Sequence, residues 1–266
     1  MIETRSLGVH IGGRTIISNI NFVARPGEVT AIVGPNGSGK TTLLRALSGD
    51  LPYSGTALLD GESFASFKPW EMAVRRAVLP QASALTFPFT VREVVEIGLT
   101  GGVSGVSAED QAELPELALE KVDLDGFADR LYQELSGGEQ QRAQLARILC
   151  QVWEPVLNGK PRYLFLDEPI SSLDIRHQIM VMEIAQGFVA AGGGVIAVLH
   201  DLNLTAMYAD RVAVMCKGAL DVIDTPLAAL TNERLERVYE CPLRINVPPP
   251  AGTPFILPQS VSWGNA

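Results

Sequence analysis

The chain has 266 residues, of which 47% are hydrophobic and 19% are charged, and its formal net charge is −9 at pH 7. A chain of this length and apolarity buries a sizeable core, which excludes a disordered protein and favours one large domain or one domain with an inserted lobe. The negative charge argues against a surface that binds DNA or RNA, because phosphate binding needs clustered Lys and Arg. We therefore expect a folded α/β protein without a nucleic-acid partner.

The cysteines and the apolar segments indicate a cytosolic protein. Cys150, Cys216 and Cys241 lie far apart and lack the spacing of a zinc or redox motif, so we expect free thiols. The first residues lack the basic and apolar stretches of a secretory signal. The apolar run of the clearest core strand, residues 195–199, is far shorter than the ~20 residues that cross a bilayer. Any role at a membrane is expected to come through a partner.

The N-terminal part of the chain predicts strands followed by one helix. Short apolar runs interrupted by turn residues over 2–23 predict an antiparallel β layer. Residues 29–33 predict a buried strand, which runs directly into a glycine-rich loop and a helical pattern over 40–47. This order of strand, glycine loop and helix is the first indication of a phosphate-binding site.

The rest of the chain alternates between helical and strand patterns. Residues 90–150 show helical spacing and predict a lobe inserted into the core. Parallel strands separated by helices are then predicted at 163–166, 195–199 and 212–215. The proline-rich end predicts an extended tail packed on the surface. We divide the chain into a core of residues 1–89 and 151–247, a helical lobe of residues 90–150 and a tail of residues 248–266.

Residues 34–41, Gly-Pro-Asn-Gly-Ser-Gly-Lys-Thr, fit the GxxxxGK[ST] pattern of a phosphate-binding loop. In such a loop, backbone N–H groups and the helix N-terminus surround the phosphates, while Lys40 supplies a cation and Thr41 a magnesium ligand. The alternative is a plain glycine turn, but eight positions match together with the correct flanks. The predicted nucleotide-binding residues are Gly34, Pro35, Asn36, Gly37, Ser38, Gly39, Lys40, Thr41 and Thr42.

Two acids follow the apolar run at 163–166. Asp167 and Glu168 stand at its end, and Pro169 stops the strand. Acids at the carboxyl end of a strand face the crevice in which open α/β sheets bind ligands. We interpret Asp167 as a magnesium carboxylate and Glu168 as the base that polarises the attacking water. Alone, such a pair is usually a solvated loop, but downstream of a phosphate loop the catalytic interpretation is favoured.

Residues 135–142, Leu-Ser-Gly-Gly-Glu-Gln-Gln-Arg, are the most diagnostic string in the sequence. Ser136 and Glu139 are typical of a capping box that opens a helix, and Gly137 and Gly138 leave the helix N-terminus bare for an anion, although a well-capped helix is the alternative. The string resembles the signature sequence of ATP-binding-cassette ATPases. This resemblance, which extends over about residues 1–245, implies an α/β fold: a P-loop NTPase core with a largely parallel sheet, an N-terminal antiparallel β layer and an inserted helical subdomain.

The same resemblance implies roles for residues elsewhere in the chain. Gln81 matches the glutamine that contacts magnesium, Asp174 matches the aspartate loop that crosses a dimer interface, and His200 matches the switch histidine at the γ-phosphate. The implied cofactors are ATP and Mg²⁺, and the implied assembly is a homodimer in which the helix that begins at Ser136 meets the ATP bound by the other subunit. His177 is left as a loop histidine.

The implied site residues form three groups. The catalytic residues are Lys40, Glu168 and His200, and the residues around the metal are Thr41, Gln81 and Asp167. Beyond the phosphate loop, the nucleotide contacts are Gln81, Ser136, Gly137, Gly138, Glu139 and Asp174. One departure concerns adenine: where the family often has an aromatic residue upstream of the phosphate loop, this sequence has His10, which could stack on the base, and Ile11, which could pack against it.

The resemblance is strongest to ATPase subunits of bacterial importers for iron-siderophore, haem and cobalamin uptake. Residues 151–160 and the Pro-rich stretch at 253–258 are similar to the haem-importer ATPases, although a tolerated surface insertion is the alternative. The resemblance implies ATP-driven haem import through a membrane permease dimer that docks near Phe87 and Phe89, with a periplasmic binding protein as an indirect partner. The location implied is the cytoplasmic face of the inner membrane. Siderophore or cobalamin cargo, and a non-transport ATPase of the same family, remain alternatives.

Overall fold

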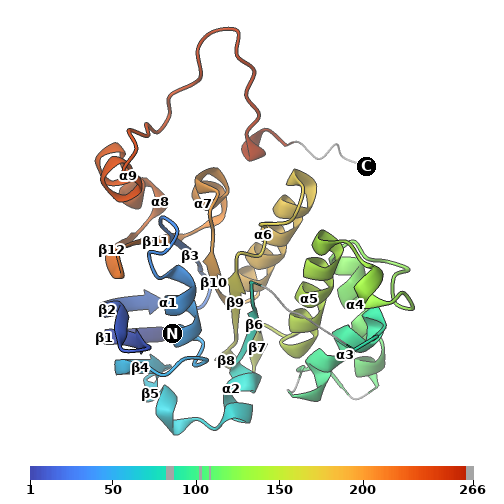
Figure 1. The fold of residues 1–266 in the computed structure, drawn as a ribbon. Coiled ribbons are helices and arrows are strands. Elements are labelled where there is room, and N and C mark those ends of the chain that lie inside the picture. Colours follow the sequence, from blue (N-terminus) through green and yellow to red (C-terminus); the bar gives the residue numbers. More distant parts are fainter. Residues whose placement is uncertain (82–86, 102–103, 108, 262–266) are drawn as a thin grey trace.

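The computed structural model describes residues 1–81, 87–101, 104–107 and 109–261. Figure 1 shows an antiparallel layer near the N-terminus, a central sheet with flanking helices, and a group of helices on the other side of that sheet. Within the described residues, the antiparallel layer has the strand order β2-β1-β4-β5. Its strands are β1 (Ile2–Ile11), β2 (Arg14–Ala24), β4 (Ser54–Leu59) and β5 (Glu62–Ser63).

The central sheet has the order β12-β11-β3-β10-β9-β6 in the described part of the chain. Neighbouring strands from β11 to β6 pair in parallel, and β12 pairs with β11 in the antiparallel sense. Because the parallel strands point the same way, the loops that follow β3, β9 and β10 meet at one edge of the sheet. The strands are β3 (Val29–Val33), β6 (Arg76–Leu79), β9 (Tyr163–Asp167), β10 (Gly194–Val198), β11 (Arg211–Cys216) and β12 (Ala219–Asp224).

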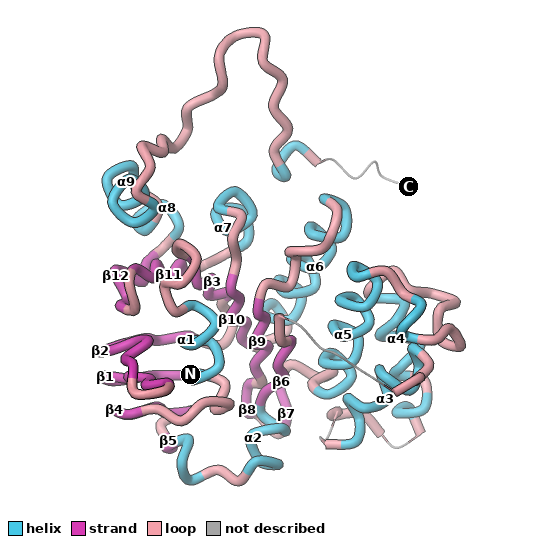
Figure 2. Tube along the Cα trace, in the orientation of Figure 1, coloured by secondary structure: helices cyan, strands magenta, loops and turns pink. Residues whose placement is uncertain are grey.

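Helices cover both faces of this sheet and form the lobe beside it, as Figure 2 shows by colour. The α-helices are α1 (Lys40–Leu47), α2 (Pro69–Arg75), α3 (Val91–Thr100), α4 (Leu114–Lys121), α5 (Gly137–Gln151), α6 (Ile175–Ala190), α7 (Leu202–Tyr208), α8 (Pro226–Ala229) and α9 (Asn232–Tyr239). Short 3₁₀ turns are η1 (Phe64–Ser66), η2 (Asp110–Ala112), η3 (Tyr132–Glu134) and η4 (Pro258–Ser260). A small hairpin of β7 (Val156–Leu157) and β8 (Lys160–Pro161) occupies the insertion before β9.

The central strands are buried on both faces, because alternate side chains point to opposite sides of a sheet. Along β3, Val29, Ala31 and Val33 join the core that includes the helical lobe. Ile32, between them, joins the core formed with α1 and the antiparallel layer. The same alternation holds along β9 and β10. The sheet is thereby fixed between two apolar layers, and the position of its loop edge is fixed with it.

The helical lobe is built from α3, α4 and α5, and both α3 and α5 begin with a capping box. Thr90 accepts from the Glu93 N–H at the start of α3, and Ser136 accepts from the Glu139 N–H at the start of α5. The two helices pack so closely that a Cβ added at Gly98 would lie 2.0 Å from the Arg147 carbonyl oxygen. This lobe, the antiparallel layer and the parallel sheet confirm the predicted fold class. The residue boundaries of the three domains remain a prediction.

Two expectations about local structure need correction, and one is confirmed. The tail is extended, but it does not pack along the surface: it leaves the body after α9, exposes Phe255 and Ile256, and contacts α7 through η4 (Figure 1). His177 lies in the first turn of α6, so it is a helical residue. The three cysteines are free thiols as predicted. In the described residues, no helix is long and apolar enough to cross a bilayer.

Candidate functional site

The phosphate loop connects the end of β3 to the start of α1, where the sequence placed it. Two of its glycines are required by the close approach of neighbouring strands, through backbone at Gly34 and through a side chain at Gly39. A Cβ at Gly34, which has φ +147°, would lie 2.2 Å from the Met215 carbonyl oxygen. A Cβ at Gly39, which has φ +98°, would lie 2.5 Å from the Ile17 Cγ2 atom. The loop therefore fits between β2 and β11 only with glycine at these positions.

Lys40 places its ammonium group inside the loop. The side chain is buried, and its Nζ donates to the carbonyl oxygens of Gly34 at 2.9 Å and Pro35 at 3.1 Å. Burial lowers the pKa of Lys40, and the carboxylates of Glu168 and Asp167 partly oppose that effect. The result is a cation that the loop backbone and two nearby acids retain next to α1.

Asp167 and Thr41 form the oxygen-rich part of the site. Asp167 ends β9 and is 3% exposed, and the Thr41 hydroxyl donates to its Oδ1 at 3.0 Å. Burial raises the pKa of Asp167, and the hydrogen bond from Thr41 acts against it. A hydroxyl and a buried carboxylate at the start of a phosphate-binding helix are the oxygen ligands that Mg²⁺ takes when phosphate oxygens and water complete its shell. The donor set therefore fits magnesium.

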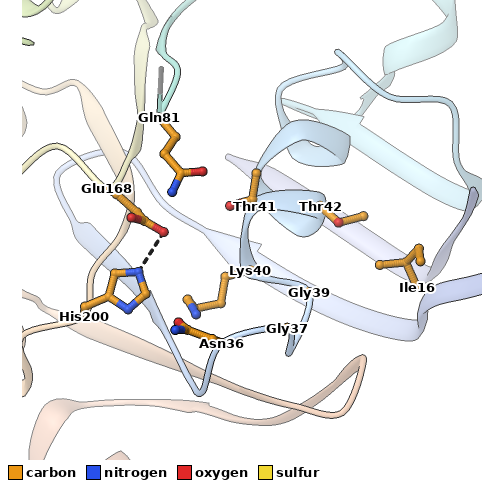
Figure 3. Close-up of a pocket in the computed structure, with 10 residues that line it drawn as sticks. All are labelled: Ile16, Asn36, Gly37, Gly39, Lys40, Thr41, Thr42, Gln81, Glu168 and His200. Carbon is orange, nitrogen blue, oxygen red and sulfur yellow. Dashed lines mark ion pairs between the residues drawn. The ribbon is translucent and has the colours of Figure 1, made fainter. Parts of the chain in front are cut away.

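Glu168 and His200 form a close pair in the pocket lining. Glu168 has φ +53°, a left-handed conformation, and its Oε1 lies 2.7 Å from the His200 Nε2 (Figure 3). Glu168 comes from the loop after β9, and His200 from the loop after β10. A carboxylate paired with a histidine beside a phosphate loop has the groups needed to orient a water molecule and accept its proton.

These side chains line one pocket of about 510 Å³. Figure 3 shows Gln81 beside Thr41 and Glu168, with Lys40 and Asn36 below them. Gln81 is thus brought to the site as predicted. The lining residues are Ile16, Asn36, Gly37, Gly39, Lys40, Thr41, Thr42, Gln81, Glu168 and His200.

The pocket has an apolar residue that the sequence did not predict. Ile16, on β2, lines it, whereas His10 and Ile11 on β1 are exposed and lie outside its lining. The carbonyl of Ile16 lies near Gly39, because β2 runs directly under the phosphate loop. The sequence pattern of residues 9–17 shows a hairpin but not which of its strands packs under that loop. The signal that would have identified Ile16 is the strand register, which is a tertiary property.

The remaining predicted contacts lie elsewhere in this chain. Ser136, Gly137, Gly138 and Glu139 form the N-terminus of α5 and are not among the described residues that line the pocket. The Ser136 hydroxyl and N–H both donate to the Glu139 carboxylate, and these bonds lower its pKa. The N-terminus of α5, which was predicted to contact the nucleotide, is therefore capped, and it lies apart from the phosphate-loop pocket of the same chain.

Asp174 also lies outside the pocket lining and caps α6. Its Oδ1 accepts from the His177 N–H at 3.0 Å and contacts the His177 Nδ1 at 2.8 Å, and these bonds lower the pKa of Asp174. The other ring nitrogen of His177 contacts the Asp123 carboxylate at 3.1 Å. His177 thereby joins the loop before α6 to the turn after α4.

The sequence and fold match known proteins over most of the chain. The chain is 62% identical over 260 residues to the hemin import ATP-binding protein HmuV of Mesorhizobium japonicum, covering 98% of this chain and 99% of that protein. It is 58% identical over 260 residues to the HmuV protein of Chelativorans sp., with the same coverage. An ATP-binding cassette of an ABC transporter in its ADP conformation superposes with a TM-score of 0.75 at 23% identity, covering 90% of this chain and 98% of that chain.

A dimeric post-hydrolysis cassette bound to ADP and Pi has a TM-score of 0.72 at 23% identity, covering 85% of this chain and 99% of that chain. These structures share the fold described above. The sequence pattern of the ABC transporter family matches residues 17–171, from the strand that carries the pocket's apolar residue past the paired acids. With this match and the close relatives over nearly its whole length, the chain belongs to the ABC transporter family.

Proposed function

We propose that the chain is the ATP-hydrolysing subunit of a bacterial haem importer. The observation that carries the hydrolytic part is the meeting of three features in one pocket. These are the loop cation of Lys40, the Thr41 hydroxyl, which is bonded to the buried Asp167 carboxylate next to the lining, and the Glu168 and His200 pair. They come from three segments far apart in the sequence, and the pocket where they meet has a volume of about 510 Å³. Cation, metal ligands and base are the groups that phosphoryl transfer to water requires.

The proposed reaction is in-line attack of water on the γ-phosphate of ATP. The oxygen of the water bonds to the γ-phosphorus while Glu168 accepts a proton from that water. The bond between the γ-phosphorus and the oxygen that bridges it to the β-phosphate breaks, which releases ADP and inorganic phosphate. The His200 Nε2 lies 2.7 Å from the Glu168 carboxylate and would face the same phosphate. Lys40 and the loop N–H groups stabilise charge on the phosphate oxygens. Mg²⁺, held by Thr41, Asp167 and Gln81, would neutralise charge on the β- and γ-phosphates.

We further propose that two copies of the chain complete each other's sites. The N-terminus of α5 carries bare glycines and the positive end of a helix dipole, which favours an anion. It does not line the phosphate-loop pocket of its own chain. Asp174 exposes 67% of its side chain, which suits contact with a second copy. In this arrangement the Ser136 end of one chain meets the γ-phosphate held by the other.

The proposed partner in the membrane is a permease dimer that contacts the Phe87 and Phe89 region. Phe87 is 68% exposed, and its ring lies 5.5 Å from that of Phe89, which packs on the core beneath. An exposed aromatic residue anchored by a second one suits the insertion of a short helix from a partner. In this proposal the chain works at the cytoplasmic face of the inner membrane, and a periplasmic binding protein acts through the permease.

Haem as the cargo rests on the relatives, whose names specify hemin import. The fold and the pocket suit an ATPase of any importer in the group, so iron-siderophore and cobalamin uptake remain the alternatives. Deleting the gene and supplying haem, a ferric siderophore or cobalamin separates them. Loss of growth on haem alone supports haem import. Loss of growth on a ferric siderophore or on cobalamin alone would assign that cargo to the importer instead.

The ATPase proposal is tested by phosphate release from the purified chain with ATP, with and without Mg²⁺. Glu168→Gln is expected to lower turnover by about 10²- to 10⁴-fold, the usual contribution of a general base, while nucleotide binding remains. Unchanged turnover in this variant would refute the assignment of Glu168. A wild-type chain that binds ATP but releases no phosphate would instead indicate a nucleotide-binding module without hydrolysis.

Permease docking is tested separately by co-purification with the membrane partner. Phe87→Asp is expected to abolish co-purification and to leave ATP binding unchanged, because the residue is exposed and lies outside the pocket lining. Leu227→Asp, at an apolar residue on α8 that is 83% exposed, is the matched control. Docking at the Phe87 and Phe89 region would be wrong if both variants co-purified equally well.

A further inference from the structure

Glu168 stands in a backbone conformation that residues with a Cβ rarely adopt. Its φ is +53°, in the left-handed region. Such a conformation persists where neighbouring groups hold the peptide in place. Because the backbone sets the direction of the Cα–Cβ bond, this conformation also decides where the carboxylate points. It points at the adjacent His200 Nε2 (Figure 3).

In the described residues, three hydrogen bonds hold the carbonyl oxygen of Glu168. Ser171 donates two of them, from its backbone N–H at 3.3 Å and from its hydroxyl at 3.1 Å. The Gln141 side-chain Nε2 donates the third, and it is the shortest, at 2.9 Å. Ser171 belongs to the same loop as Glu168 and moves with it. Gln141 lies on α5, 27 residues earlier in the chain, so its bond fixes the Glu168 peptide relative to the helical lobe.

The surroundings of Gln141 leave its amide one orientation. Its Oε1 is buried and has no hydrogen-bond partner among the described residues. A reversed amide would place that oxygen against the Glu168 carbonyl, so that two acceptors would face each other. The N-terminus of α5 also lies close to the same loop: a Cβ at Gly138 would be 3.1 Å from the Ser172 carbonyl oxygen. The helix is thus near enough for Gln141 to reach the Glu168 peptide.

We propose that Gln141 is a positioning residue for ATP hydrolysis. Its amide holds the Glu168 peptide so that the carboxylate points at the water and at His200, and it makes the direction of that carboxylate depend on the position of α5. Gln141 does not line the pocket and is not expected to contact the nucleotide. The inference rests on the ATPase activity proposed above.

The test compares Gln141→Met, which keeps the side-chain length and removes the donor, with Gln140→Met. The Gln140 amide donates to the carbonyls of Tyr132 and Leu135, so its contacts stay within the helical lobe. Gln141→Met is expected to lower kcat by about tenfold to a hundredfold, the scale of a misplaced catalytic group, while KM for ATP and binding of a fluorescent ATP analogue change by less than about twofold. Gln140→Met is expected to change kcat by less than about threefold.

A double variant separates positioning from a general loss of structure. In a Glu168→Gln background, Gln141→Met is expected to lower the residual turnover no further, since the group it positions is already absent. The proposal is overturned if Gln141→Met behaves like Gln140→Met, if the two losses multiply, or if nucleotide binding and the unfolding midpoint fall together with kcat. Should Gln141→Met fail to fold, Gln141→Asn, whose amide is too short to reach, gives the same comparison. A wild-type chain without phosphate release refutes the ATPase proposal itself before any variant is compared.

Discussion

Burial shifts the pKa of Lys40 in the phosphate loop and of Asp167 beside it. It lowers the pKa of Lys40 and raises the pKa of Asp167, so each charged form is disfavoured in the folded protein. A bound ligand of opposite charge would favour each charged form: the phosphates of ATP for the Lys40 ammonium, and Mg²⁺ for the Asp167 carboxylate.

Asp167→Asn is expected to increase the free energy of unfolding of the nucleotide-free chain at neutral pH. The folded pKa of Asp167 lies above its ordinary value of 3.8, so the folded state binds the proton more tightly than the unfolded state. The carboxylate therefore destabilises the fold at pH values above the folded pKa, and this cost disappears as the pH falls toward 3.8. Urea unfolding at pH 7.5 and pH 5 measures the difference between variant and wild type.

The control for this prediction is Glu62→Gln, a surface substitution on β5 that is expected to change stability by less than about 0.5 kcal/mol. The Asp167 variant is also expected to lose the magnesium dependence of nucleotide binding. A variant that is less stable than the wild type at pH 7.5, or a stabilisation that grows toward pH 5, contradicts the argument.

Ile16→Ala is expected to weaken ATP binding, because Ile16 is a large apolar side chain that lines the pocket. Removing the methylene and methyl groups that ATP would cover should lower the affinity about fivefold to thirtyfold, on the scale of about 0.8 kcal/mol for each buried CH₂. Ile11→Ala is the matched control, since Ile11 is 50% exposed on the neighbouring strand. Equilibrium titration with a fluorescent ATP analogue measures the affinity of both variants. A larger loss of affinity in Ile11→Ala would favour the sequence-based alternative that Ile11 packs against the adenine.

At the scale of elements, the two capping boxes of the helical lobe have the same chemistry and different proposed roles. Ser136 caps α5 and Thr90 caps α3, each accepting from the N–H of a glutamate three residues later. Each hydroxyl satisfies one of the open N–H groups at a helix start. The boxes therefore offer an internal comparison between stability and function.

Ser136→Ala and Thr90→Ala are each expected to destabilise the chain by about 1 kcal/mol, the usual cost of losing such a cap. Only Ser136→Ala is expected to lower ATP turnover as well, because Ser136 is proposed to meet the γ-phosphate of the second copy. Thermal unfolding and phosphate release, measured on the same preparations, check both effects. Equal turnover in the two variants would leave Ser136 with a structural role alone.

At the scale of the whole molecule, the separation of the α5 N-terminus from the phosphate loop of the same chain predicts assembly. A ligand that binds between two copies stabilises the dimer by its differential affinity for the paired state. In Glu168→Gln, hydrolysis is blocked and this state should persist. The variant is expected to elute as a dimer on a sizing column with MgATP and as a monomer with ADP, and a monomer under both conditions would contradict the shared site.

Much of the site could be predicted because its chemistry is contiguous in the sequence. The phosphate loop, the paired acids after β9 and the capped start of α5 each depend on residues within one short segment, and the structure places Lys40, Thr41, Gln81, Glu168 and His200 around one pocket. The parallel strands follow from alternating strand and helix patterns, which are also local. Gln81 and His200 have no local signature of their own, and they were predicted through their resemblance to the family.

The tertiary structure decided what depends on contacts between distant segments. It placed Ile16 instead of His10 or Ile11 at the pocket, because the packing of β2 under the phosphate loop sets which strand faces the ligand. In the tertiary structure the tail leaves the body after α9, and His177 lies in α6 and contacts the carboxylates of Asp174 and Asp123. It also brought Gln141 to the Glu168 carbonyl across 27 residues of chain. A sequence pattern specifies residues that act within one loop or turn, whereas the distance between two elements is fixed only when their side chains pack together.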